Sequence, residues 1–305
     1  MILYGTKVHS DLPFPLHLPA TGDTRYEIDL RQGLPEDIRG EIRCGSFLYT
    51  THGRRVFLYS DRLLEEPIPG QPYCYEAERI VRFSWRHGER TVRYELLEEG
   101  NADLLAFWFI HLFQPLYMTF EGLSVFFHSG AVEIEGAAIA FIAPSTGGKS
   151  TMTHCFLTHG HSLITDDILP IWLDGDHVVC APSFPYYRPF RAPETLGYFT
   201  DNYTTDFRPL QALYVLEKGD ADTPTVIDAL QGYRKFEALK KSGLVYTFDF
   251  MTLSHNRILS SLLNYVKVFR VTRPWDMSRL DEVYREIQGH AASCKCTDGI
   301  KTNGP

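Results

Sequence analysis

The segment that most restricts how this chain can fold is AAIAFIAPSTGGKSTMTHCFLTH, residues 137–159. An apolar run of strand length leads into a loop with two adjacent glycines, Gly147 and Gly148, and then into a stretch that can form a short helix. Backbone N–H groups of such a loop and the positive end of the helix can point at one anion. The segment therefore predicts an α/β unit with a phosphate-binding loop.

The loop fits the pattern G-x-x-x-x-G-K-[ST] at every defined position except the first, where Ala143 replaces glycine. In this pattern the lysine binds the β- and γ-phosphates and the hydroxyl binds Mg²⁺. A glycine-rich turn with a solvated lysine is the alternative, because Gly-Lys-Ser also arises by chance. The predicted nucleotide-binding residues are Ser145, Thr146, Gly147, Gly148, Lys149, Ser150 and Thr151.

Two adjacent acids, Asp166 and Asp167, end the next apolar run, SLIT. A Mg–nucleotide site requires acidic groups on a second strand, because the loop hydroxyl cannot hold the metal alone. Taken alone, Asp-Asp at a strand end is typical of a solvated turn. Here the pair follows Ser150 by one helix and one strand, and this position favours a nucleotide site.

Residues 127–171 resemble the core of the HPr kinase/phosphorylase family, which has a histidine, two strands, a phosphate loop, a short helix and an Asp-Asp pair in this order. The corresponding elements are His128, the loop 143–150, THGH at 158–161, and Asp166–Asp167. The opening MILYGTKVHSDLPFP looks more like the shorter proteins of this family found beside peptide-modification genes. These include kinases of the C-terminal serine of lasso-peptide precursors, in which an alanine at the first loop position is familiar.

The resemblance implies transfer of the γ-phosphate of ATP, or of another nucleoside triphosphate, to a serine hydroxyl of a ribosomally made, lasso-type peptide. It assigns Lys149 to the phosphates, and Ser150 and Asp167 to Mg²⁺. Asp166 would accept the proton of the acceptor hydroxyl, although the two acids could exchange these roles. His128 would lie beside the transferred phosphate, with a core histidine as the alternative.

The chain departs from the family after the two acids. The family's Glu-x-Arg element has no counterpart in residues 181–194, where Arg188 and Arg191 have no glutamate directly before them and Glu194 follows. We expect Arg188 to contact phosphate or substrate, and a surface arginine stacked on a tyrosine is the alternative. The family's basic Pro-Gly-Arg segment, linked to dephosphorylation, is only faintly matched by VTRPWD (271–276), which predicts a kinase that does not run in reverse.

The fold class predicted is α/β, with an HPr-kinase-like phosphate-loop domain at 122–290, a β-rich N-terminal domain at 1–121 and a loose tail at 291–305. The N-terminal domain could bind the peptide. Alternating apolar and polar residues at 80–86 and 91–97 predict a hairpin there. The end of the chain has no periodicity.

The apolar run Leu104–Phe120 is the one candidate for a membrane span, but it is shorter than the roughly 20 residues required. It also contains His111, Gln114 and Pro115. We therefore expect a buried helix, capped by Asp103 and ending near Pro115.

The net charge limits which partners the protein can bind, and the cysteines indicate its redox environment. The chain has 30 Lys and Arg against 38 Asp and Glu, a net charge of −8, which argues against binding to duplex DNA. Six cysteines without a C-x-x-C pair predict reduced thiols in a cytosolic protein, and the first residues show no secretory signal. We expect no nucleic-acid or membrane partner, and a homo-oligomer stays open.

Two weaker metal candidates occur. His154, His159 and His161 lie close together, but no neighbouring cysteine or acid is expected to complete a ligand set, so a helix end is the preferred interpretation. Cys294 and Cys296 could bind metal or oxidise, but they fall in the predicted tail.

Two other functions remain compatible with the sequence. The first is a kinase for a small-molecule hydroxyl, which a small closed cavity in the N-terminal domain would favour over an open peptide groove. The second is a nucleotide-binding sensor or scaffold without transfer. A kinase and a sensor differ in their need for Asp166. A kinase requires its carboxylate for phosphate transfer, whereas a sensor that only binds the nucleotide does not.

Overall fold

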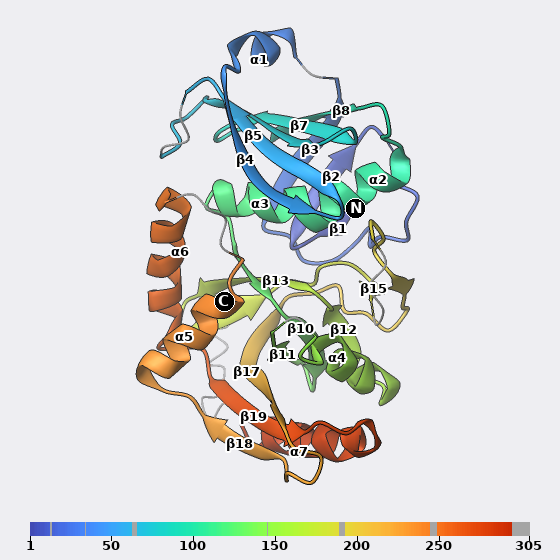
Figure 1. Ribbon diagram of the computed structural model, residues 1–305, viewed down its shortest axis with the longest axis vertical. Helices are drawn as coiled ribbons and strands as arrows, with labels where there is room; N and C mark the ends of the chain where they lie inside the picture. Colours follow the sequence, from blue (N-terminus) through green and yellow to red (C-terminus); the bar gives the residue numbers. More distant parts are fainter. Residues whose placement is uncertain are drawn as a thin grey trace, which may run out of the picture.

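The computed structural model describes residues 1–294 apart from residues 13, 34, 63–65, 145, 189–192 and 245–248, and apart from the side chains of residues 37 and 249–254. The chain forms two large mixed β-sheets with helices between and beside them (Figure 1). The structure is thus of the α/β type. The predicted limits of the two domains stay a prediction.

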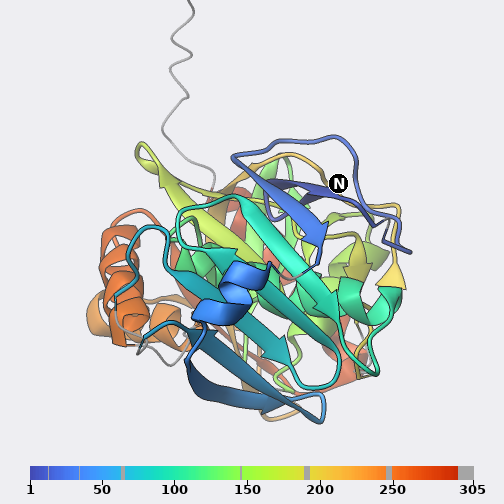
Figure 2. The same ribbon diagram turned by 90° about the horizontal axis from the view of Figure 1, so that it is seen from above.

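The N-terminal sheet has eight strands, of which β2–β3 and β3–β8 pair in parallel and the others antiparallel. The predicted hairpin is confirmed, with Val81 opposite Leu96. Helix α1 (Glu36–Glu41) lies on the outer side of this sheet, at the end of the molecule (Figures 1 and 2). In order across the sheet the strands are β1 (Ile2–Leu3), β2 (Thr6–Ser10), β3 (Tyr26–Gln32), β8 (Thr91–Leu96), β7 (Val81–Arg86), β6 (Pro72–Ala77), β5 (Arg54–Ser60) and β4 (Cys44–Thr51).

A helical run lies between the two sheets (Figure 1). It comprises α2 (Ala102–Phe107), the π-helical segment η1 (Trp108–Phe113) and α3 (Gln114–Phe120). Nearly all of its side chains from Leu105 onward are buried, which explains its apolar sequence without a membrane.

The expected end of this helix near Pro115 is wrong. Proline removes one backbone donor, and here it falls at the start of α3, directly after η1. There the N–H of Gln114 donates to the carbonyl of Phe109, the longer bond of a π-helix, and the chain continues as a helix. The expected cap is also corrected: the side chain of Asn101, not Asp103, accepts from the N–H of Leu104 at 2.9 Å.

The second sheet contains the glycine loop. Its strands β11, β17 and β19 are parallel neighbours, so their carboxyl ends meet at one edge of the sheet. A separate short pair is formed by β15 (Tyr186–Tyr187) and β16 (Tyr198–Phe199). The strands of the second sheet are β9 (Val125–His128), β10 (Gly130–Ile134), β11 (Ala137–Ile142), β12 (Ser162–Thr165), β13 (Ile168–Asp174), β14 (His177–Cys180), β17 (Arg208–Gly219), β18 (Val226–Ala229) and β19 (Val268–Pro274).

Helices cover both faces of the second sheet. On one face α4 (Lys149–Thr158) and α7 (Leu280–Ser293) pack over Phe141 and Tyr214. On the other, α5 (Gly232–Ser242) and α6 (Asp249–Leu262) pack side by side. The short 3₁₀ segment η2 (Met277–Arg279) precedes α7.

The predicted tail begins too early. Residues 291–293 continue α7, and Ala291 is buried against the core of the second sheet. Cys294 caps this helix, whereas Cys296 lies outside the described residues.

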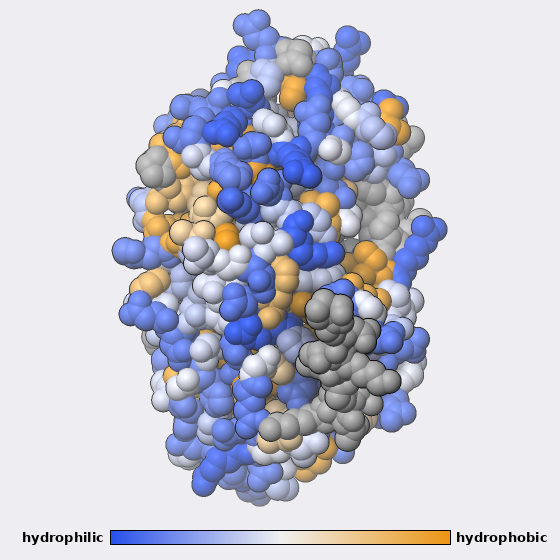
Figure 3. Space-filling model, turned by 180° about the vertical axis from the view of Figure 1, so that it is seen from behind, coloured by the Kyte–Doolittle hydropathy of each residue, from blue (hydrophilic) through white to orange (hydrophobic). Residues whose placement is uncertain are grey.

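Within the described part of the chain, no helix combines the length and the apolar content needed to cross a bilayer. The face seen in Figure 3 is mainly hydrophilic, with hydrophobic residues in small separate groups.

Candidate active site

The glycine loop joins the carboxyl end of β11 to the start of α4. The N–H of Gly147 donates to the carbonyl of Pro144 at 2.8 Å, and a Cβ at position 147 would lie 2.6 Å from the Cβ of Ala143. Gly148 has a φ of 84°, a left-handed conformation that glycine adopts without steric cost. Ala143 therefore leaves room only for glycine at position 147.

The other predicted loop residues occupy the junction of loop and helix. Thr146 also has a positive φ, of 62°, while Ser150 and Thr151 follow Lys149 in the first turn of α4. The amino end of α4 faces the loop and carries partial positive charge. Ser145 lies outside the described residues.

A chain of polar contacts leads from the loop to the second acid. The Lys149 ammonium lies 3.2 Å from Nε2 of His128, whose Nδ1 lies 3.0 Å from Oδ1 of Asp167. Both contacts are satisfied by one tautomer, in which Lys149 donates to Nε2 and the Nδ1–H donates to Asp167. The predicted residues Lys149, His128 and Asp167 thus meet in space, and the side chain of His128 is 33% exposed rather than buried in the core.

Arg188 completes this cluster. Its Nη2 lies 2.6 Å from Oδ2 of Asp167, and its side chain is only 12% exposed, so it is not the surface arginine of the alternative. The same nitrogen lies 3.0 Å from Nε2 of His111. His111 comes from the helical run between the sheets and also approaches Oδ2 of Asp167, at 3.3 Å.

The carboxylate of Asp166 has a different environment. Its Oδ2 accepts the backbone N–H of Arg188 at 2.8 Å, and Oδ1 has no hydrogen-bond partner within the described residues. The residue is 5% exposed. Burial, with a smaller contribution from the charge of Asp167, raises the pKa of Asp166 to about 6, although the Arg188 N–H and the Lys149 charge act against it.

The pKa of Asp167 moves the other way. Burial alone would raise it, but the hydrogen bond from His128 and the charge of Arg188 outweigh burial and hold the pKa well below its ordinary value. Burial lowers the pKa of His111 to about 3, so this imidazole is neutral at physiological pH. Two adjacent acids therefore differ, one permanently ionised and one able to exchange a proton near neutrality.

Sequence reasoning missed two residues of the site, His111 and Arg273. Arg273 is the second-last residue of β19, and its Nη2 donates to the carbonyl of Gly147 at 2.9 Å. Its guanidinium is buried, and Nε has no hydrogen-bond partner among the described residues. The faint match of residues 271–276 to the family's Pro-Gly-Arg segment could have pointed to Arg273. His111 lies in an apolar run, and nothing in that run indicates a site residue.

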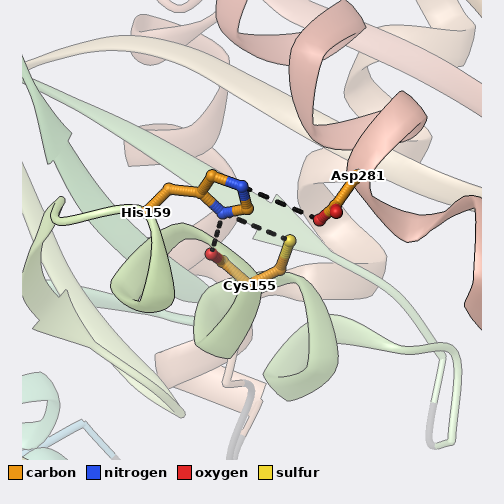
Figure 4. A group of neighbouring side chains, drawn as sticks. All are labelled: Cys155, His159 and Asp281. Atoms are coloured by element: carbon orange, nitrogen blue, oxygen red, sulfur yellow. Dashed lines mark hydrogen bonds and ion pairs between the residues drawn. The ribbon is translucent and has the colours of Figure 1, made fainter.

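A second cluster lies at the other end of α4 (Figure 4). Contrary to expectation, a cysteine and an acid do join His159: the ligand atoms of Cys155, His159 and Asp281 lie within 4.8 Å of one another. His159 nevertheless uses Nδ1 in a 2.8 Å hydrogen bond to the carbonyl of Cys155, and its ring stacks on Tyr284. Burial raises the pKa of the Cys155 thiol to about 11. His159 thus closes the carboxyl end of α4, the helix-end role expected from the sequence.

Comparison with known proteins gives little further guidance. No family model matches the chain, and no curated protein matches it. Among solved structures, the Hpr(Ser) kinase/phosphatase from Coxiella burnetii is similar over 55% of this chain and 97% of its own, with 10% identity and a TM-score of 0.33. A TM-score this low does not establish a common fold, so the case for the site depends on its residues and geometry.

Proposed function

We propose that the protein is an ATP-dependent kinase that transfers the γ-phosphate to a serine hydroxyl of a peptide. The observation that carries the proposal is the polar chain from the glycine loop to the acids, with successive contacts of 3.2, 3.0 and 2.6 Å through Lys149, His128, Asp167 and Arg188. A solvated glycine turn would not need a lysine buried against a histidine and an ion pair.

The cations of the site suit phosphoryl transfer, in which catalysis is mostly positioning and charge neutralisation. Lys149 and the amino end of α4 would bind the β- and γ-phosphates, and Arg188 would neutralise charge on the transferred group. Arg273 supports the loop through Gly147. Asp167 holds Arg188 and orients His128.

Asp166 is the residue we propose as the base. A pKa of about 6 leaves it mostly ionised at pH 7 yet able to take up a proton, and its Oδ1 is without a protein donor in the described structure. Asp167 is a poorer base because its pKa is lowered. Of the two assignments left open by the sequence, we therefore propose Asp166 as the base and Asp167 as the residue that could bind the metal.

Magnesium fits the site in part. The hydroxyl of Ser150, in the first turn of α4, would be one ligand, and bound Mg²⁺ would neutralise phosphate charge. Both oxygens of Asp167 already face nitrogen donors, so Asp167 would reach the metal by giving up a contact with His128 or Arg188. A phosphate group entering the site can take over the Arg188 contact.

The peptide acceptor and the one-way reaction rest on the sequence resemblance. The N-terminal sheet would bind the peptide, since the helical run beneath it carries His111 to the site. Transfer in the forward direction alone follows from the weak match to the family's dephosphorylation segment.

The test is incubation of the purified protein with Mg–ATP and a pool of serine-ended peptides, followed by mass spectrometry. We expect a gain of one phosphate with the native protein, and none with Lys149→Ala or Asp166→Asn. Asp166→Asn should still bind ATP. Phosphate appearing on a small alcohol instead would identify a small-molecule kinase, and full biological activity of Asp166→Asn would identify a sensor.

A further inference from the structure

A small pocket lies beside the glycine loop, at the edge where three parallel strands end. β11 leads into the loop, β17 ends with Lys218 and Gly219, and β19 ends at Pro274, directly before Trp275. Lys218 is opposite Arg273 in the strand register. Ligands of open α/β sheets bind beyond the carboxyl ends of such strands.

The pocket measures about 130 Å³. Gly148 and Thr151 form its wall on the side of the loop, and Trp275, Met277 and Leu280 form the apolar side. Trp275 is 46% exposed and Met277 70%, so both present apolar surface to solvent next to the loop. Single exposed apolar residues are common on protein surfaces. Two that line the same pocket beside the glycine loop indicate a surface that binds a ligand.

We propose that this pocket binds the base of the nucleotide, with the base stacked on Trp275 and in contact with Met277. The inference rests on the proposed function, which places the phosphates on the glycine loop. Gly148 and Thr151 belong to both sites, so one ligand can extend continuously from Lys149 into the pocket.

The size and chemistry of the pocket fit a base. Pockets that hold a whole ligand measure roughly 300–1,000 Å³, so about 130 Å³ suits one planar part of a larger molecule. Trp275 provides a flat aromatic surface, on which any base can stack. Two cations lie over the Trp275 ring, Lys218 Nζ at 3.9 Å and the Arg273 guanidinium at 4.9 Å from its centre. A stacked base would replace the exposed Lys218 contact, which is weak.

The test compares two probes by calorimetry, Mg–ATP and magnesium tripolyphosphate, which lacks the base. We expect Trp275→Ala to weaken ATP binding by roughly tenfold and to leave tripolyphosphate binding unchanged. Trp275→Phe should retain most of the ATP affinity, and Met277→Ala should weaken it less than Trp275→Ala. Tyr265→Ala removes a similarly exposed aromatic residue away from this edge and should change neither affinity.

The outcomes separate the two proposals. Unchanged ATP affinity in Trp275→Ala, with loss of binding in Lys149→Ala, would overturn the base pocket and leave the kinase proposal intact. An equal loss of ATP and tripolyphosphate binding in Trp275→Ala would also overturn it, because the residue would then act on the phosphates. If the native protein binds neither probe, the proposed function itself fails.

Discussion

Asp166 and Asp167 are neighbours in the chain, but Arg188 holds them by different groups: its backbone N–H donates to Asp166 and its guanidinium pairs with Asp167. The backbone contact leaves one oxygen of Asp166 without a protein donor within the described residues, whereas the two oxygens of Asp167 accept from His128 and Arg188. The pKa values of the two carboxyl groups consequently move in opposite directions. Different roles for the two acids follow from this difference.

The transfer rate should depend on pH through Asp166. Because the base must be ionised, the rate should rise as the pH passes through about 6 and level off above it. Single-turnover rates between pH 4.5 and 8 would measure this, with ATP affinity followed at each pH as the control. A rate that rises around pH 4 instead of around pH 6 would contradict a base with a raised pKa.

Asp166→Asn should stabilise the protein while abolishing transfer. Since the folded-state pKa is raised, the contribution of Asp166 to stability is fully present below its unfolded pKa and is lost as pH rises through about 6. A neutral amide avoids this loss and can still accept the Arg188 N–H. Urea unfolding should show a gain of roughly 2–3 kcal/mol at pH 8 and almost none at pH 4. Destabilisation at pH 8 would contradict the prediction.

Asp167→Asn should have the opposite effect. The variant leaves the buried Arg188 guanidinium without its carboxylate, which costs about 3–5 kcal/mol of unfolding free energy. The folded-state pKa of Asp167 is lowered, so its stabilising contribution is present above the unfolded pKa and is lost as pH falls through the folded one. Urea unfolding at pH 7 measures the effect. Adding Arg188→Met should recover part of the loss, and a double variant less stable than Asp167→Asn would argue against the pair.

His111 should act as a positioning residue for Arg188. His111→Phe keeps a buried ring but removes the contact with Nη2, so we expect kcat to fall by about tenfold to a hundredfold while KM for ATP stays the same. Steady-state kinetics separates the two constants. The control is His87→Phe, which removes a histidine paired with Glu121 away from the site. Equal effects of the two variants would show a general loss of packing.

The glycines at the two ends of α4 provide a matched pair. Gly148 and Gly160 both have positive φ, of 84° and 88°, but a Cβ at 148 would overlap the Arg273 guanidinium, whereas a Cβ at 160 meets nothing within 4 Å. The positive φ alone should cost each alanine variant about 1 kcal/mol of stability, and Gly148→Ala should lose more because its Cβ displaces the guanidinium. We expect only Gly148→Ala to weaken ATP binding, as measured by calorimetry. Equal weakening by Gly160→Ala would exclude a specific effect at the loop.

Local patterns predicted much of the fold and part of the site. Alternating residues predicted the hairpin of β7 and β8, and the strand–loop–helix order expected around Lys149 appears in β11 and α4. The resemblance over residues 127–171 implied that Lys149, His128 and Asp167 belong to one site, and these three side chains do contact one another in succession.

The remaining features depend on contacts between distant parts of the chain. His111 meets Arg188 across 77 positions, and Arg273 meets Gly147 across 126, distances over which no periodic pattern carries information. Cys155 and Asp281 approach each other only because α4 packs on α7. Pro115 led to a wrong helix end because the π-helical segment η1 precedes it and the chain continues as α3. The sequence contains no pattern that predicts a π-helix at this place.

The contact of His111 with both Arg188 and Asp167 also limits how this chain can be divided. A shortened version that starts at residue 122 would lack the imidazole and would expose Phe126 and Ile168, which pack into the core of the N-terminal sheet. Chimaeras that exchange the first 120 residues for those of another protein would have to carry over a histidine at the same place. The two halves therefore share one buried core and one polar contact, and neither can be exchanged without rebuilding both.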